Sequence, residues 1–268
     1  MFSPQIHIVF NCEEEERITN PIIDNPPNKL YYFTAIIRKT NQKDINIDYY
    51  EKNTRFLKKK IPLLEIIQKE VDYTDYIEII QELSKIIKTE RDENPHCKIF
   101  INISTGSKMA SIASVEASKL WNCDIYYVFS SLYDPHGGGP RHKGKFFIKT
   151  PITFPIKKPK EIYIKTLKII QNLIKTKYEN KEYDVELELF IYKKRLIEEL
   201  EKRGLIELES KHQDPTSRKS ALYMKSTKFL EPLVKEMRYV KISDDKRNKR
   251  IYLTKAGKDI LKIFKFLV

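Results

Sequence analysis

A short turn, Ser104–Lys108 (Ser-Thr-Gly-Ser-Lys), constrains the fold of this chain more than any other segment. The residues before it, Lys98–Ile103, are mainly β-branched or aromatic, which predicts a buried strand. Apolar residues after it recur at helical spacing as far as Trp121: Met109, Ile112, Ala113 and Leu120. The chain is therefore expected to pass from the carboxyl end of a strand into the amino end of a helix through a small, hydroxyl-rich turn.

A turn of this kind predicts an anion-binding site. Free backbone N–H groups at the positive end of a helix dipole attract anions, and Lys108 adds a full positive charge beside them. The alternative is that Ser104 or Thr105 only caps the helix. The GxxxxGK[ST] spacing of a Walker A loop is absent, so the sequence gives no support to nucleoside triphosphate hydrolysis.

The first half of the chain predicts alternating strands and helices. The predicted strands are 5–10, 30–37, 64–71, 98–103 and 124–129, and the predicted helices are 48–60, 76–87 and 109–121. This order predicts an α/β fold, a Rossmann-like parallel sheet with helices on both faces. Ligands of such sheets bind beyond the carboxyl ends of the strands. Asn11 and Cys12 follow the first strand, so they are expected to share that edge with Ser104–Lys108.

The loop Asp134–Lys145 has two open interpretations. It contains three consecutive glycines followed by Arg141 and His142, so it could cover a bound ligand or form a surface hairpin. Asp134, His136 and His142 could in principle hold a metal, but loop histidines beside glycines are usually solvated, so we expect no metal. The three cysteines show no C-x-x-C spacing, which predicts free thiols and no zinc site.

The positive charge of the chain is concentrated in its second half. The net charge is +13 over 268 residues; residues 1–150 hold 21 Lys and Arg against 20 Asp and Glu, whereas residues 151–268 hold 29 against 17. The segment from Lys211 to Lys255 contains 13 basic and 5 acidic residues. A general lysine bias would spread over the whole chain. The asymmetry therefore predicts that the second half binds a polyanion.

Prolines mark a linker at 151–160, which divides the chain into predicted domains at 1–150 and 161–268. In the second domain, the sequence predicts helices at 162–174 and 190–202, the latter ended by Gly204. It then predicts a short strand at 205–208. A two-helix unit follows, 220–224 and 228–238, in which Pro232 is acceptable only near a helix start. Strands at 239–243 and 250–253 flank a basic hairpin, and a final helix begins after Leu253-Thr254-x-x-Gly257.

The helix, the basic hairpin and the Leu-Thr-x-x-Gly segment resemble the wing of winged-helix DNA-binding domains. In such a domain the wing lies along the phosphate backbone and a recognition helix enters the major groove of double-stranded DNA. The alternative is that the hairpin is only a solvated turn. The candidate wing residues are Lys246, Arg247, Lys249 and Arg250, and the candidates around the recognition helix are Arg218, Lys219, Lys225 and Lys228.

Residues 102–108 (Asn-Ile-Ser-Thr-Gly-Ser-Lys) are similar to the second ligand-binding motif of CARF (CRISPR-associated Rossmann fold) domains, often Asn-x-Thr-Gly-Gly-Thr-Lys. Asn102, Gly106 and Lys108 match; Ser104, Thr105 and Ser107 replace threonine, glycine and threonine. With its basic second domain, the chain resembles archaeal CARF–winged-helix regulators. The resemblance implies a homodimer that binds a cyclic oligoadenylate, with cyclic tetra-adenylate favoured. The candidate ligand-binding residues are Asn11, Cys12, Ser104, Thr105, Gly106, Ser107, Lys108 and Arg141.

Two functions follow from the resemblance. The first is a ligand-responsive transcription regulator with no catalytic residue and no cofactor, connected to CRISPR antiviral defence. The alternative is a metal-independent ring nuclease in which Ser107 and Lys108 position the phosphodiester of the cyclic ligand. The sequence shows no His–carboxylate pair or metal cluster to drive hydrolysis. It also shows no apolar run that could cross a bilayer and no secretion signal, so we expect a cytoplasmic protein without a membrane partner.

Overall fold

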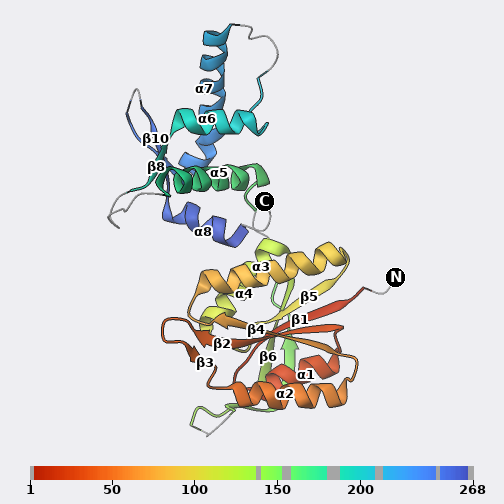
Figure 1. Cartoon of the computed structure of the whole chain (residues 1–268). Coiled ribbons are helices and arrows are strands. Elements are labelled where there is room, and N and C mark those ends of the chain that lie inside the picture. The colour runs from red at the N-terminus through yellow and green to blue at the C-terminus, as the bar shows by residue number, and fades with distance from the viewer. Residues whose placement is uncertain are drawn as a thin grey trace. The chain divides into compact units, whose positions relative to one another are not determined.

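The computed structural model describes residues 3–136, 140–152, 158–179, 188–208, 214–245 and 248–264. The chain divides into two compact units, Met1–Lys158 and Pro159–Val268 (Figure 1). No helix in the described residues is both long enough and apolar enough to cross a membrane.

A largely parallel sheet forms the centre of the first unit. Its strands are β1 (Gln5–Phe10), β2 (Lys29–Ile37), β3 (Gln42–Lys43), β4 (Glu65–Asp72), β5 (Lys98–Asn102), β6 (Asp124–Tyr133) and β7 (His142–Lys149). β1 pairs in parallel with β2 and β5, β4 extends the sheet beyond β2, and β6 extends it beyond β5. β3 and β7 pair antiparallel with β2 and β6. The strand order reverses between β1 and β5, so ligand binding is expected beyond the carboxyl ends of these two strands.

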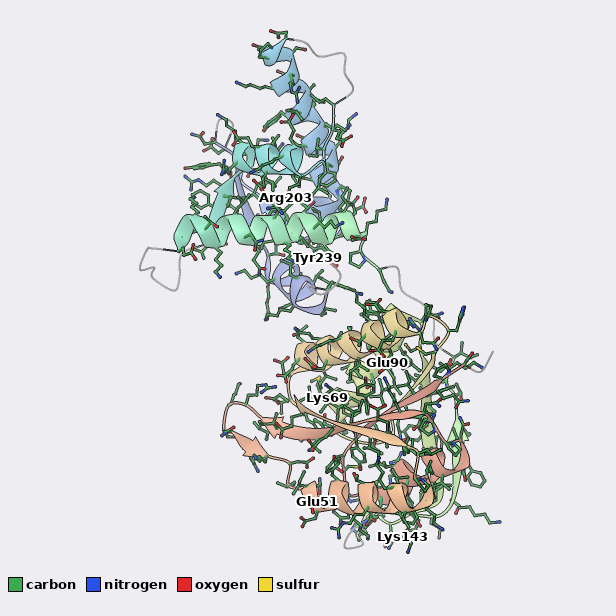
Figure 2. All side chains as sticks on the ribbon, turned by 45° about the vertical axis from the view of Figure 1, so that its right-hand side comes forward. Glu51, Lys69, Glu90, Lys143, Arg203 and Tyr239 are labelled. Carbon is green, nitrogen blue, oxygen red and sulfur yellow. The ribbon has the colours of Figure 1, made fainter. Side chains whose placement is uncertain are left out.

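Helices cover both faces of this sheet. α1 (Glu15–Asp24) and α2 (Ile47–Lys60) lie on one face, and α3 (Tyr76–Glu93) and α4 (Lys108–Trp121) lie on the other (Figure 1). The same layering is visible in Figure 2, where Glu51 of α2 and Glu90 of α3 lie on opposite sides of the sheet. β1 and β2 are buried along almost their whole length because both of their faces are covered. The predicted α/β class is confirmed.

The segment Asp134–Lys145 connects the two strands of a β-hairpin, β6 and β7, and includes the start of β7, which agrees with the second of the two interpretations. β6 continues to Tyr133, four residues beyond the predicted strand, and β7 returns beside it from His142. The glycines at 137–139 lie outside the described residues. The extension of β6 was missed because its second half is mostly exposed and lacks the apolar run of a buried strand.

The second unit has the element order of a winged-helix domain. It comprises α5 (Glu161–Tyr178), β8 (Phe190–Tyr192), α6 (Lys193–Lys202), α7 (Pro215–Glu231), the π-helical turn η1 (Pro232–Glu236), β9 (Val240–Ile242), β10 (Arg250–Leu253) and α8 (Lys255–Phe264). β10 lies between β8 and β9 in an antiparallel sheet. Thr254 fixes the start of α8, because its Oγ1 accepts the N–H of Gly257 (3.1 Å) and donates to the carbonyl of Arg238 (2.8 Å).

Three details of this unit differ from the sequence prediction. Residues 190–192 form β8 rather than the start of a helix, and residues 205–208 form no strand. The predicted pair of helices is one helix, α7, which begins at an Asp214 cap followed by Pro215. Pro232 lacks the N–H that would continue the helix, so the backbone widens into η1, where the N–H of Met237 donates to the carbonyl of Pro232 (2.9 Å).

Candidate functional sites

The turn after β5 rests directly on the end of β1. Gly106 has a φ of +80°, and a Cβ added there would lie 2.6 Å from the Cβ of Phe10. No larger residue fits without moving one of the two segments. The predicted neighbours from separate strands, Asn11–Cys12 after β1 and the Ser104–Lys108 turn after β5, are therefore brought together at the point where the strand order reverses.

Ser107, rather than Ser104 or Thr105, caps α4. Its Oγ accepts the N–H of Ala110 (3.0 Å) and donates to the carbonyl of Tyr73 (2.9 Å). Ser104 instead binds β6 through its Oγ, which accepts the N–H of Val128 (2.5 Å). Thr105 is buried, and its Oγ1 has no hydrogen-bond partner in the described part of the chain. The predicted capping serine or threonine was therefore placed two or three residues too early.

Two backbone donors remain at the start of α4. The first N–H groups of a helix have no acceptor within it. Ser107 satisfies Ala110, but the N–H groups of Lys108 and Met109 have no acceptor among the described residues. These two groups lie at the positive end of the helix dipole, where the sequence predicts an anion-binding site.

A cleft of about 310 Å³ opens at this edge of the sheet, lined by residues of five segments: the end of β2, β3 with the loop after it, and the segments after β1, β4 and β5. Four of the predicted residues line it: Asn11, Cys12, Gly106 and Ser107. The other lining residues are Ala35, Ile37, Gln42, Lys43, Asp44, Ile45, Asn46, Tyr73 and Thr74. We refer to it as the switch-point cleft.

Asn11 builds one wall of the switch-point cleft. Its Nδ2 donates to the Oδ2 of Asp44 (2.9 Å) and to the carbonyl of Asn46 (2.7 Å), and its Oδ1 accepts from the hydroxyl of Tyr32 (3.1 Å). The amide is thus fully used in holding the 44–46 loop in place. Burial raises the pKa of the Cys12 thiol beside it, so that thiol is neutral at physiological pH.

Lys108 and Arg141 do not line the switch-point cleft. Lys108 is exposed at the first position of α4, and no hydrogen bond or salt bridge holds its ammonium within the described residues. Arg141 is exposed on the β6–β7 hairpin, and its backbone N–H donates to Glu14 (3.0 Å). Lys108 therefore remains near the cleft as the first residue after Ser107, whereas Arg141 belongs to a different cluster.

That cluster contains a His–carboxylate pair, contrary to the sequence expectation. The Nδ1 of His142 lies 2.9 Å from the Oε1 of Glu14. Arg17 is buried beside them, and its Nε donates to the carbonyl of Val128 (3.0 Å). The pair was missed because 128 residues separate its members. No group of His, Cys, Asp and Glu that could hold a metal occurs among the described residues.

Sequence reasoning missed Lys43, Tyr73 and Thr74 at the switch-point cleft. A signal for them existed, because Tyr73 and Thr74 directly follow β4. The rule that selected the residues after β1 and β5 applies equally to every parallel strand of the sheet. Lys43 lies on the two-residue strand β3, which has no pattern long enough to be recognised in a sequence.

The helix α7 presents a basic surface. Only Leu222, Ser226 and Leu230 are buried, at a spacing of four, so the remaining faces of the helix are open to solvent. Lys219 and Lys228 are exposed and make no salt bridge with acids of the described residues. Such a helix, the next one along the chain after α6 and before the strands β9 and β10, has the position of a recognition helix.

The other DNA-binding candidates differ in their surroundings. Arg218 pairs with Glu201, and Lys225 donates to the carbonyl of Glu207. Arg250 lies over the ring of Phe190, with Cζ 4.9 Å from the centroid. The carbonyl of Lys249 accepts the N–H of Lys193 (2.8 Å), which joins the wing to the start of α6. Lys246 and Arg247 lie outside the described residues.

Lys193 lies beneath this surface and is only 3% exposed. Its Nζ donates to the Oγ1 of Thr227 (2.6 Å) and lies 3.8 Å from the centroid of Tyr223, both on α7. Burial, with a smaller contribution from the charge of Lys249, lowers the pKa of Lys193 from 10.5 to about 8. A buried cation thus joins α6, α7 and the wing.

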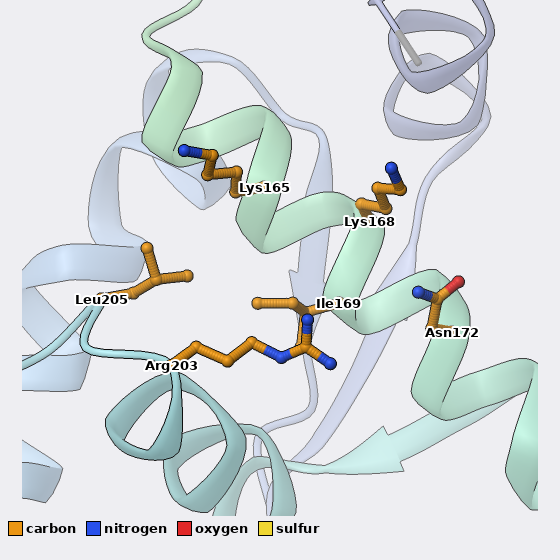
Figure 3. Close-up of a pocket in the computed structure, with 6 residues that line it drawn as sticks. All are labelled: Lys165, Lys168, Ile169, Asn172, Arg203 and Leu205. Carbon is orange, nitrogen blue, oxygen red and sulfur yellow. The ribbon is translucent and has the colours of Figure 1, made fainter. Parts of the chain in front are cut away.

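A second hollow, of about 480 Å³, lies between α5 and the end of α6 (Figure 3). Its lining residues are Lys165, Lys168, Ile169, Asn172, Arg203 and Leu205. Lys165 pairs with Glu161 (2.6 Å) and Arg203 pairs with Glu199 (2.7 Å), so these two cations are balanced by carboxylates one helical turn away. This arrangement presents less unbalanced positive charge than the exposed face of α7.

The close contact between Gly106 and Phe10 predicts that one added methyl group at position 106 strongly lowers the stability of the first unit. Gly106→Ala should lower the free energy of unfolding of the first unit by about 1–3 kcal/mol or more, because it combines a positive φ with an overlap against Phe10. Gly204→Ala is the matched control: it also has a positive φ, but its nearest neighbour is a flexible Glu207 oxygen at 3.4 Å. Urea unfolding should show a larger loss for Gly106→Ala; equal losses would contradict the close packing.

The buried Lys193 predicts a pH dependence. The folded protein releases this proton near pH 8 and the unfolded chain near pH 10.5, so the unfolded state binds more protons in between and stability rises with pH there. Below pH 8 both states are charged and the full penalty of burial applies. The stability of Lys193→Met relative to the wild type should therefore fall as the pH rises from 8 to 10.5. A difference independent of pH in urea unfolding would contradict the burial of a titrating ammonium.

Comparisons with known proteins agree with this two-part architecture. Residues 5–133 match the family model described as "HFX_2341_N:-like, N-terminal", and residues 167–265 match the DUF6293 C-terminal winged helix domain. No curated protein gives a significant match.

Several solved structures share part of the arrangement at low identity. Csm6 from Enterococcus italicus, bound to cyclic hexa-2'-fluoro-hexa-dAMP, has 12% identity and a TM-score of 0.41 over 48% of this chain and 34% of its own. Can2 from Sulfobacillus thermosulfidooxidans, in complex with cyclic tetra-adenylate, has 16% identity and a TM-score of 0.37 over 94% of this chain and 77% of its own. A type III CRISPR defence DNA nuclease activated by cyclic oligoadenylate has 12% identity and a TM-score of 0.36 over 87% of this chain and 35% of its own.

This chain thus spans about a third of the length of Csm6 and of the DNA nuclease. The assignment of the two domains rests on the family models, because these match the two units separately and in the expected order. The predicted winged-helix domain is confirmed: this chain joins an N-terminal domain that matches the HFX_2341_N-like model to a DUF6293 C-terminal winged-helix domain.

Proposed function

We propose that the protein is a DNA-binding transcription regulator that responds to a cyclic oligoadenylate. Two features of one chain carry this proposal. The first is the pair of backbone donors of Lys108 and Met109, which have no acceptor in the described residues and directly follow Ser107 of the switch-point cleft. The second is an exposed basic helix in a winged-helix domain. Residues 1–150 act as the sensor, 151–160 as the linker and 161–268 as the DNA-binding domain.

The chemistry of the switch-point cleft supports a nucleotide ligand. The N–H groups of Lys108 and Met109, directly after the cleft residue Ser107, are suited to a phosphodiester. Lys43 adds positive charge within the cleft and Lys108 adds it beside the cleft. Ile37 and Ile45 offer apolar surface for a base. The similarity of residues 102–108 to the CARF motif favours a cyclic oligoadenylate, with cyclic tetra-adenylate as the first candidate.

The size of the cleft supports a homodimer. A volume of about 310 Å³ is at the lower end of the range for sites that enclose a small molecule. A ring of several nucleotides exceeds it, so one copy of the chain holds only part of the ring. Closed two-fold dimers are the commonest oligomers, and a second copy on a two-fold axis would supply the same donors to the other half of the ring.

The ring-nuclease alternative gains no support from the geometry. Ser107 would have to position a phosphodiester, but its hydroxyl is already used to cap α4 and to bind Tyr73. The pair of Glu14 and His142 borders a separate hollow together with Glu15 and Glu16, and not the switch-point cleft. We therefore retain sensing without cleavage as the proposed activity.

Removal of the Lys108 charge tests the sensor. Lys108→Ala should weaken the binding of cyclic tetra-adenylate by about 1–3 kcal/mol, the range for a hydrogen bond to a charged group. Lys119→Ala is the matched control, because Lys119 lies near the other end of α4 and pairs with Glu116. Isothermal titration calorimetry of the full chain measures both. Wild-type protein that binds neither cyclic tetra- nor hexa-adenylate would refute the sensor.

Neutralising the exposed cations of α7 tests the DNA-binding surface. The double variant Lys219→Ala/Lys228→Ala should weaken binding to double-stranded DNA and reduce the dependence of log K on log salt by about 0.9 for each phosphate that the variant no longer binds. Lys258→Ala/Lys262→Ala removes the same charge from α8 and should have a smaller effect. Anisotropy titrations at several salt concentrations give both quantities. Equal effects of the two double variants would show that α7 is not the DNA-binding helix.

A further inference from the structure

The outer face of the winged-helix sheet carries aromatic rings and cations that duplex binding through α7 does not use. Ile191 of β8, Ile251 of β10 and Val240 of β9 are buried on the inner face. The neighbouring residues alternate to the other side, as in any strand. The residues of this outer face are Phe190, Tyr192, Lys241, Arg250 and Tyr252, and Lys177 joins them from the end of α5.

Strand register places rings and cations next to one another. Tyr252 lies opposite Phe190 on one side and Lys241 on the other, and Arg250 lies opposite Tyr192. The ring of Phe190 is 5.4 Å from that of Tyr192 and 5.8 Å from that of Tyr252, measured between centroids. The three rings therefore form one continuous aromatic surface across two strands.

Three cations lie among these rings. The Nζ of Lys177 is 3.5 Å from the centroid of Phe190 and 5.0 Å from that of Tyr192, and it donates to the carbonyl of Phe190 (3.1 Å). The Cζ of Arg250 is 4.9 Å from the centroid of Phe190, and the Nζ of Lys241 is 5.7 Å from that of Tyr252. The aromatic surface is thus positively charged.

Among the residues that the structure describes, little on this face balances that charge, and part of the aromatic surface is open. Lys241 forms a 3.7 Å salt bridge with Glu188, but the two side chains are 63% and 69% exposed, so the pair contributes little. Tyr192 is 44% exposed. Packing against an apolar protein segment would bury three cations that have little to balance them in the described part of the chain. A polyanion with flat rings would satisfy both the cations and the aromatic rings.

The exposed aromatic rings favour single-stranded nucleic acid over a duplex as the polyanion. The bases of a duplex are stacked on each other, so a duplex offers phosphates but no ring faces to a side chain. A single strand offers both, and interleaved aromatic and basic residues on a sheet are suited to it. We propose that the outer face of β8, β9 and β10 binds single-stranded nucleic acid, with a base stacked on Tyr192 and phosphates at Lys177, Lys241 and Arg250.

This site is additional to the proposed binding of double-stranded DNA by α7. Arg250 is shared between the two, because it is also a candidate wing residue. Tyr192 is not shared, since it lies on β8 and has no role in the proposed duplex binding. The two activities are therefore separable by substitution.

The test uses the full chain and fluorescein-labelled oligothymidylate and oligouridylate of about 16 nucleotides, the upper length of a single-stranded site on one small domain. Fluorescence anisotropy should show binding of one or both. Tyr192→Ala should weaken it at least about fivefold, the loss of one stacked base, and Tyr192→Phe should restore it. Tyr133→Ala, which removes an exposed tyrosine from the first unit, should have no effect. A preference for oligothymidylate or oligouridylate identifies DNA or RNA as the strand.

This test of single-strand binding can succeed or fail independently of the proposed duplex binding by α7. Tyr192→Ala should leave duplex binding unchanged, and Lys219→Ala/Lys228→Ala should weaken duplex binding while single-strand binding persists. Circular dichroism checks that each variant is folded. The proposal is overturned if neither oligonucleotide binds at low salt, if Tyr192→Ala binds as the wild type does, or if the α7 double variant abolishes both activities together.

Discussion

The contact between Gly106 and Phe10 is the constraint on which the N-terminal site depends. Because the turn after β5 rests on the end of β1, the first turn of α4 faces the point where the strand order reverses. Ser107 then binds the segment after β4, and Ser104 binds β6. One close approach thus brings the segments after β1, β4 and β5 together at a single cleft, with the turn after β5 also tied to β6. Within the described residues it leaves two N–H groups free, because the capping hydroxyl satisfies the third.

In the winged-helix domain, the pattern of buried residues decides which side chains of α7 and of the sheet are exposed. A narrow buried stripe on α7 leaves most of that helix exposed, and its lysines then form a basic surface. In the sheet, strict alternation buries Ile191 and Ile251 and places Tyr192 and Arg250 outside. The buried Lys193 contacts both elements: its Nζ donates to Thr227 of α7, and its backbone N–H donates to the carbonyl of Lys249 beside β10. The same small fold therefore offers one basic helix and one aromatic, basic sheet face.

Sequence reasoning succeeded where burial leaves a strong local pattern. β1, β2 and β5 are apolar on both faces, so their continuous runs and the helices between them were predictable. It failed where a contact is distant or a segment is short. β8 has three residues and joins α6 without a break, and the pairing of Glu14 with His142 depends on a hairpin that returns to α1. The role of Ser107 as the α4 cap was missed because three hydroxyl residues compete in one turn, and only the backbone path decides among them.

Hydrogen–deuterium exchange with cyclic tetra-adenylate tests the central claim, that the first N–H groups of α4, beside the switch-point cleft, bind the ligand. The amides of Lys108 and Met109 lack acceptors among the described residues, so they should exchange rapidly in the free protein and slowly in the complex. Peptides covering residues 42–46, on the opposite wall of the cleft, should gain protection as well. Protection that is absent from both segments while the ligand is bound would contradict the account.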